Sequence, residues 1–129
     1  APSSCSKIQD NRGRIARRAN EGWVYTLLLI YRIMFELTGF QRDLLYCIAG
    51  VDDPSGQEVS RELEQSSSFE VNHGRLYPNL DDLVDKGLVE KQSKDRRTNL
   101  YRLTDQARKL IADRRQWEDE RLEQLSLDA

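Results

Sequence analysis

With 129 residues, at roughly 100 to 200 residues per domain, the chain is expected to form one compact domain rather than a multidomain enzyme. Hydrophobic residues make up 38% and charged residues 33%, against about 45–50% and about 25% in typical globular chains, so polar surface outweighs core. The 20 basic and 22 acidic side chains give a net charge of −2 at pH 7, which requires neither a nucleic-acid nor a membrane partner.

Charge is distributed unevenly along the chain. Residues 1–21 carry five basic and two acidic side chains, and we interpret residues 1–22 as a basic N-terminal extension. Residues 34–129 carry 14 basic and 20 acidic side chains, a net charge of −6. An acidic body of this kind is unusual for a protein that binds DNA, so only local charge patterns can indicate such a function.

Residues 23–37 are apolar on nearly every side, which predicts a buried helix used for packing or dimerisation. A membrane span needs about 20 apolar residues, and this shorter run contains Arg32, so we expect no membrane partner. No small-residue cleavage site follows it, and a cytoplasmic location is therefore expected. Met34 is the only methionine and stands where the composition shifts, which leaves the role and authenticity of residues 1–33 open.

Helix-capping residues precede four stretches with apolar side chains at helical spacing. These candidate N-caps are Thr38, Ser55, Asn72 and Thr104. The predicted helices run to about Val51, Gln65, Lys86 and Leu125, respectively. The serines at 66–68 are predicted to form a polar connector, and Gly87 is predicted to end the third helix in a left-handed conformation.

Between the third and fourth helices the periodicity changes to that of strands. Residues 88–92 and 98–103 alternate between apolar and polar side chains, and residues 93–97 between them are mostly polar and basic, which predicts a two-stranded hairpin with a basic tip. The last helix would be roughly 30 Å long at about 1.5 Å per residue, more than this small domain can cover. Part of its apolar stripe therefore needs a partner, either the 23–37 helix or a second subunit.

The predicted fold is mainly α with a small β-hairpin, in the order of a winged helix-turn-helix that spans residues 38–103. Residues 72–89, with Gly74, Leu76-Tyr77-Pro78 and Gly87, resemble the signature of the PadR-like family of transcription regulators. Residues 97–104 resemble that family's second wing strand. Residues 40–45 look most like haloarchaeal members, one of which regulates the response to reactive oxygen species.

This resemblance implies a homodimer built from the helices at 23–37 and 104–129, which flank the winged domain. It also implies repression through a palindromic operator in double-stranded DNA, with a link to oxidative stress. The residues with apolar side chains that we assign to the dimer interface are Leu28, Tyr31, Phe35, Leu110, Trp117, Leu122 and Leu125.

The third helix carries the candidate DNA contacts. Its start offers side chains that can donate to phosphates or base edges, where the helix dipole also favours phosphate. These residues are Asn72, His73, Arg75, Tyr77 and Asn79. Arg75 is the best candidate for direct readout, because its donor fork can grip guanine, whereas Tyr77 could equally be a core residue. The later Asp81, Asp82 and Asp85 should be repelled by the duplex.

The hairpin supplies the second group of candidate contacts. Its basic and polar residues suit phosphate or minor-groove contact, although a plain solvated turn would have the same composition. The candidates are Lys91, Lys94, Arg96, Arg97 and Thr98.

Other function classes are less well supported. The chain shows no pairing of nucleophile and base, no glycine-rich phosphate loop and no paired carboxylates, so we predict that it is not an enzyme. Cys5, Cys47 and the single His73 lack zinc-ligand spacing, and no metal or other cofactor is expected. Cys47 is predicted to be a buried, inert thiol. The acidic charge leaves open a winged-helix module that binds protein instead of DNA, and any small-molecule effector stays unknown.

Overall fold

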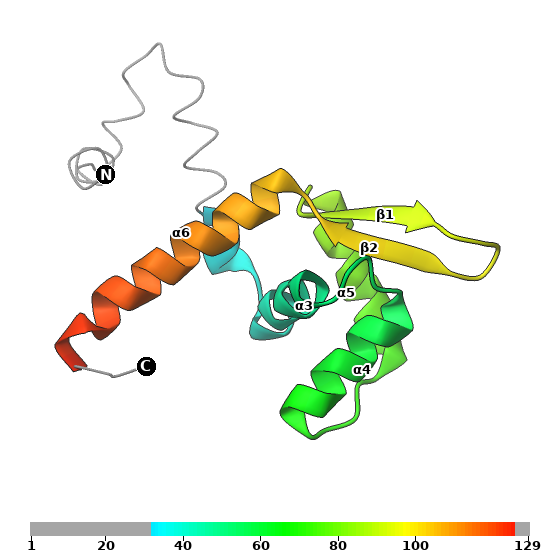
Figure 1. Cartoon of the computed structure of the whole chain (residues 1–129), viewed down its shortest axis with the longest axis horizontal. Helices are drawn as coiled ribbons and strands as arrows, with labels where there is room; N and C mark the ends of the chain where they lie inside the picture. Colours follow the sequence, from blue (N-terminus) through cyan, green and yellow to red (C-terminus); the bar gives the residue numbers. More distant parts are fainter. Residues whose placement is uncertain (1–31, 126–129) are drawn as a thin grey trace, which may run out of the picture. The chain divides into compact units, whose positions relative to one another are not determined.

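The computed structural model describes residues 32–125. The basic extension, most of the predicted 23–37 helix, and Leu28 and Tyr31 lie outside the described residues. A helical segment at residues 32–36 is followed by the elements labelled in Figure 1. These are α3 (Gly39–Gly50), α4 (Gly56–Ser67), α5 (His73–Asp85), β1 (Val89–Ser93), β2 (Asn99–Leu103), α6 (Asp105–Leu122) and the short 3-10 helix Glu123–Leu125. The mainly helical class with one small hairpin is thereby confirmed.

The four predicted N-caps all begin helices. The side chains of Thr38 and Ser55 accept bonds from the backbone N–H groups of Gln41 and Glu58, and both form reciprocal capping boxes. Asn72 and Thr104 cap α5 and α6 in the same way, through single side-chain bonds. Each cap satisfies an N–H group that the first turn of a helix leaves without a partner.

The chain after α5 reverses at Gly87, which has a φ of +78°. This left-handed conformation follows the end of the helix as predicted, and a residue without a Cβ adopts it at the lowest steric cost.

Two predicted boundaries were wrong. Ser66 and Ser67 belong to α4 rather than to a connector, and their hydroxyls donate to the Glu62 and Leu63 carbonyl oxygens one turn earlier, at 3.1 and 2.7 Å. The helix ends only at Ser68, whose φ is +65°. The strands and the intervening hairpin tip also lie about one residue later than predicted, so that the tip consists of residues 94–98.

The two-stranded sheet is extended by an isolated one-residue bridge that the sequence analysis missed. β1 and β2 pair in antiparallel register, with Val89 opposite Leu103. On the other side of β2, Ser55 forms an isolated bridge with Leu100, and the Tyr101 N–H donates to the Pro54 carbonyl oxygen at 2.8 Å. The segment that leads into α4 is therefore fixed to the hairpin.

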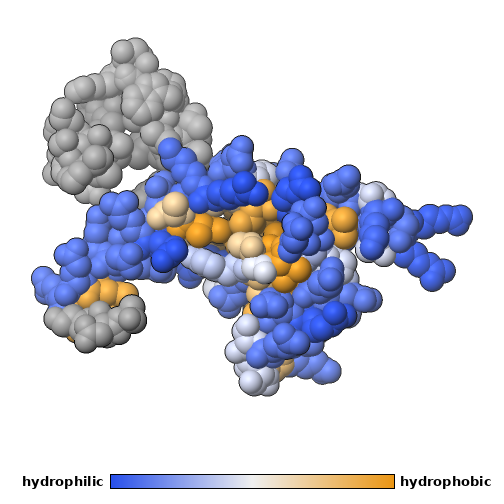
Figure 2. All heavy atoms as spheres, viewed as in Figure 1, coloured by the Kyte–Doolittle hydropathy of each residue, from blue (hydrophilic) through white to orange (hydrophobic). Residues whose placement is uncertain are grey.

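The core of the winged region collects apolar side chains from every helix and from both strands. Its fully buried members include Leu44, Leu45, Val59, Leu76, Leu80, Leu83, Val89, Tyr101 and Leu110. Figure 2 shows apolar side chains across the middle of the visible face, bordered by hydrophilic residues. Burial of each leucine contributes roughly 1.5–3 kcal/mol to folding. Within residues 32–125, no helix combines the length and apolar character that a membrane crossing requires.

Gln41 is a buried polar residue that joins α3 to α5. Only 6% of it is exposed, and its Nε2 donates to Asn79 Oδ1 at 2.9 Å and to Asp82 Oδ2 at 2.8 Å. Lys86 Nζ also bonds Asp82 Oδ2, at 2.6 Å. Because both bonds from Gln41 reach the same helix, they fix how α5 lies on α3.

The C-terminal half of α6 extends beyond this core. Ala107 and Leu110 are buried, but Leu122 is 40% exposed and Leu125 is 63% exposed. In Figure 1 this end of α6 lies away from α3, α4 and the hairpin, and Figure 2 shows an apolar spot there. The expectation that this helix is too long for its own domain is confirmed.

Candidate nucleic-acid interface

The first half of α5 presents polar side chains on the surface. His73, Arg75 and Tyr77 are exposed, and their helix is anchored from behind by the buried Leu76 and Leu80. Asn72 is exposed as well, but its Oδ1 accepts the Gly74 N–H at 2.7 Å as the helix cap. Three of the predicted contact residues are therefore accessible on the surface, and Asn72 caps the helix that carries them.

Arg75 lies over an aromatic ring. Its Cζ is 3.9 Å from the centroid of the Phe40 ring on α3, within the range of a cation–π interaction. The Arg75 side chain makes no ion pair or hydrogen bond with another of the described residues 32–125. Its N–H groups are thus available to a partner outside the chain.

Tyr77 belongs to the contact between α4 and α5. An ideal Cβ placed on Gly56 would lie 2.5 Å from Tyr77 Cε1, so the first residue of α4 has to be a glycine for the ring to lie there. The ring is 36% exposed and meets His73 edge-on, with 5.9 Å between centroids. Tyr77 is therefore neither a core residue nor a freely extended side chain.

Asn79 is engaged within the protein. Its Nδ2 donates to the Arg75 carbonyl oxygen at 2.8 Å, while its Oδ1 accepts the bond from Gln41. The side chain is half-buried. Through its bond to the Arg75 carbonyl oxygen, Asn79 stabilises the exposed helical turn that carries Arg75.

The acidic half of α5 carries less free negative charge than the sequence suggests. Asp81 pairs with Lys91 of β1 at 2.9 Å, and Asp82 pairs with Lys86 at 2.6 Å. The bond from Lys86 lowers the pKa of the Asp82 carboxyl, and the bond to Asp81 raises the pKa of Lys91. The Asp81–Lys91 pair also links α5 to the hairpin. Lys91, which the sequence analysis assigned to DNA, is therefore paired within the protein.

The hairpin tip is closed by a carboxylate. Asp95 Oδ1 accepts the backbone N–H groups of Arg97 and Thr98, both at 2.9 Å, and Ser93 Oγ donates to the Asp95 carbonyl oxygen. The bond from the Arg97 N–H lowers the pKa of Asp95. Thr98 is half-buried, whereas the side chains of Lys94, Arg96 and Arg97 are exposed and make no ion pair with residues 32–125. The tip is a preformed turn with three outward basic side chains.

The start of α4 contacts both α5 and strand β2 of the hairpin. Tyr77 packs there against Gly56. The bond from the Ser55 backbone N–H lowers the pKa of the Glu58 carboxyl, and the charges of Arg61 and Lys94 lower it further, while Ser55 itself forms the bridge to Leu100 of β2. The start of α4 therefore connects the helix and the hairpin that carry the two groups of candidate contacts.

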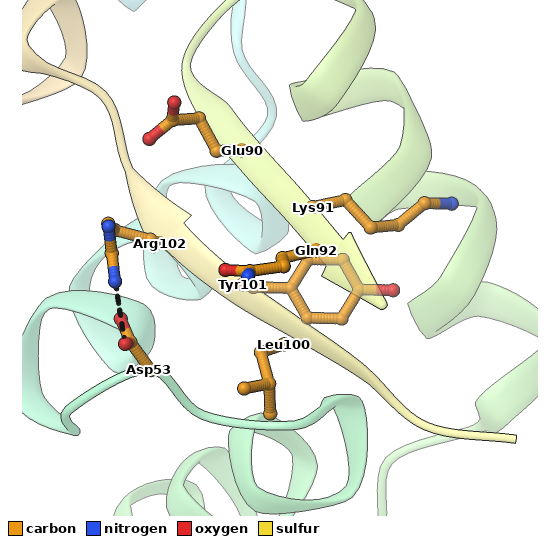
Figure 3. Close-up of a pocket in the computed structure, with 7 residues that line it drawn as sticks. All are labelled: Asp53, Glu90, Lys91, Gln92, Leu100, Tyr101 and Arg102. Atoms are coloured by element: carbon orange, nitrogen blue, oxygen red, sulfur yellow. Dashed lines mark hydrogen bonds and ion pairs between the residues drawn. The ribbon is translucent and has the colours of Figure 1, made fainter. Parts of the chain in front are cut away.

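The other side of the hairpin has a different character. Arg102 holds Asp53 through two bonds, Nε to Oδ1 at 2.9 Å and Nη2 to Oδ2 at 2.7 Å, beside a small cavity (Figure 3). These bonds lower the pKa of Asp53 and raise that of Arg102. Arg102 is thus a basic wing residue that is committed within the chain, unlike those at the tip.

The predicted interface residues on α6 fall into two environments. Leu110 is 1% exposed and belongs to the core of its own chain, so it is not left for a second subunit. Trp117 meets Phe35 edge-on, with 5.2 Å between ring centroids, and the guanidinium carbons of Arg114 and Arg121 lie 4.7 and 4.6 Å from the centroid of its ring. Within residues 32–125, the apolar stripe continues into solvent beyond this cluster at Leu122 and Leu125.

The profile of the transcriptional regulator PadR-like family matches residues 44–113. The chain belongs to the PadR-like family. RosR of Halobacterium salinarum, in a complex structure, is 46% identical with a TM-score of 0.65, over 67% of this chain and 77% of that one. A second RosR structure, from crystals grown from NaBr, gives 46% identity and a TM-score of 0.63, over 72% and 81%. Comparison with curated proteins finds no significant match.

A more distant structure supports the fold. A MarR/EmrR family transcriptional regulator from Acinetobacter is 21% identical, with a TM-score of 0.55 over 89% of this chain and 81% of that one. The PadR-like protein is thus a winged-helix transcriptional regulator related to a haloarchaeal regulator, and the predicted resemblance is confirmed. Its family consists of regulators and not of enzymes.

Proposed function

We propose that this PadR-like protein is a homodimeric repressor that binds a palindromic operator in double-stranded DNA. In this proposal the first half of α5 enters the major groove, and the hairpin tip contacts the flanking backbone. The observation that carries the proposal is that Arg75 on α5 and Lys94, Arg96 and Arg97 at the hairpin tip are exposed and make no ion pair with residues 32–125. Family membership supports DNA as the partner.

The residues proposed to contact DNA have unequal roles. Arg75 reads a base, while His73 and Tyr77 contact the backbone beside it. Lys94, Arg96 and Arg97 contact phosphates or the minor groove. The conformation of these elements is supported by Asn72, Asn79 and Thr98. Lys91 contacts a phosphate only if DNA binding breaks its exposed ion pair with Asp81.

The second subunit is proposed to cover the exposed end of α6. Leu122, Leu125, Trp117 and Phe35 present apolar surface there, which a symmetric partner would bury. To match a palindrome, such a dimer would have to hold its two α5 helices about one DNA turn apart, roughly 34–36 Å.

We further propose a cytoplasmic role in the oxidative-stress response, on the basis of the relation to RosR. Cys47 is unsuited to be the sensor. It is 8% exposed, and burial raises the pKa of its thiol to about 11, so little reactive thiolate forms at neutral pH. The signal is therefore expected to act elsewhere on the protein.

Recovery of bound genomic fragments tests the proposal directly. The full chain, mixed with sheared genomic DNA and then captured, is expected to enrich fragments that share one palindromic motif. A mobility shift on that motif and on a scrambled sequence then measures the preference. If no motif is enriched and neither duplex is shifted, the alternative of a winged-helix module that binds only protein replaces the DNA-binding proposal.

Replacement of the hairpin-tip arginines tests how the tip acts. Arg96→Ala and Arg97→Ala are each expected to weaken binding to operator and random DNA alike, because phosphate contacts carry no sequence information. Each should also reduce the slope of log affinity against log salt by about one. Arg102→Ala is the matched control, since Arg102 is engaged by Asp53, and it should leave the slope unchanged. A loss confined to the operator would contradict the assignment of the tip to phosphates.

A further inference from the structure

Two consecutive residues in the first turn of α3 contact the exposed turn of α5. Phe40 is only 9% exposed, and its ring lies under the Arg75 guanidinium at 3.9 Å. The next residue, Gln41, bonds Asn79, and Asn79 in turn bonds the Arg75 carbonyl oxygen. Both the side chain and the backbone of Arg75 are therefore held by contacts that begin at Phe40 and Gln41.

An aromatic ring constrains a guanidinium group in a particular way. The cation–π contact uses the flat face of the group, whereas its five N–H donors lie in the plane and stay free. A freely moving arginine loses side-chain conformational entropy when its guanidinium N–H groups align with a base edge, and this loss weakens binding. A side chain that already rests on a buried ring has lost part of that freedom before DNA arrives.

From this geometry we propose that Phe40 is a positioning residue for base recognition. It lies below α5 and touches the reading side chain without contacting DNA itself. The inference deepens the proposed function and rests on the assignment of Arg75 as the base-reading residue. Removal of the ring should reduce discrimination at the base pair read by Arg75 about two- to fivefold, as expected for an exposed cation–π contact, and should leave phosphate-based affinity unchanged.

The test compares Phe40→Leu with Phe40→Tyr in the full chain. Leucine keeps an apolar side chain in the pocket but removes the ring, whereas tyrosine keeps the ring. The probes are the palindromic duplex recovered from genomic DNA, its single-base-pair variants and a random duplex. Phe40→Leu should lose preference at the same base pair as Arg75→Ala, with an unchanged salt slope, and Phe40→Tyr should retain the preference. In an Arg75→Ala background, Phe40→Leu should have no further effect on preference.

A measurement without DNA tests the contact itself. The ring current of Phe40 should shift the Arg75 side-chain proton resonances upfield, and Phe40→Leu should abolish this shift while the amide spectrum stays that of a folded protein. An unshifted Arg75 in the wild-type chain would overturn the inference.

The outcomes separate the inference from the function on which it rests. If Arg75→Ala relaxes one base pair but Phe40→Leu does not, the positioning role fails and DNA reading stands. A uniform loss on all duplexes in Phe40→Leu would show a merely structural role and would likewise overturn the inference. If the wild-type chain prefers no duplex, the proposed function itself fails.

Discussion

Replacing Leu122 and Leu125 together by glutamate is expected to make the protein monomeric and to weaken operator binding by about a hundredfold or more. Both side chains are exposed within a single chain, at 40% and 63%, so the winged domain should stay folded. The loss would arise because a dimer places its second half on the operator at a high effective concentration, which a monomer lacks. Light scattering gives the mass, and titration of the full palindrome gives the affinity.

Two controls separate dimerisation from folding and from added charge. Gln116→Glu adds negative charge at an exposed position of α6 without removing an apolar side chain, and it should stay dimeric. On an isolated half-site, to which only one subunit can bind, the double glutamate variant and the wild-type chain should have the same weak affinity. A dimeric double variant, or a monomer with undiminished affinity for the palindrome, would show that α6 does not build the DNA-binding assembly.

Arg75→Ala should reduce discrimination at one base pair by about 1–3 kcal/mol, roughly 5- to 150-fold, because a bidentate contact to guanine would be lost. Affinity for random DNA should fall far less. Arg75→Lys should keep most of the non-specific affinity but lose the preference, since lysine has a point charge instead of a planar fork. Dissociation constants for the operator and its single-base-pair variants measure both effects.

Lys109→Ala provides the matched loss of a basic side chain, because Lys109 is exposed on α6 and makes no ion pair with residues 32–125. It should leave the base preference unchanged. If Arg75→Ala weakens all duplexes equally, Arg75 contacts only phosphate, and base recognition must come from another side chain on α5.

Local signals explain why most of the fold could be predicted. Thr38, Ser55, Asn72 and Thr104 mark helix starts because a cap is a contact between residues two or three positions apart. Ser66 and Ser67 were misassigned because serine hydroxyls can bond a helix carbonyl as well as favour a turn. The one-residue bridge at Ser55 is too short to produce an alternating pattern.

The exposed parts of the candidate site could be predicted, but their internal support could not. Gln41 carries a local signal as the third residue of a capping box, yet its bonds to Asn79 and Asp82 depend on how two helices pack. The same holds for Phe40 beneath Arg75 and for Asp81 beside Lys91. Sequence patterns indicate which side chains face solvent, whereas contacts between distant segments need the tertiary structure.

The closure of the hairpin tip by Asp95 has a consequence for the energetics of association. Since the carboxylate already fixes the backbone at Arg97 and Thr98, a duplex would meet a loop in its final shape. Little chain entropy would then be lost in the encounter, and only the long cationic side chains would have to settle. In the proposed complex, a rigid loop with flexible side chains would tolerate variation in phosphate spacing between sequences, and the choice of site would then depend on α5.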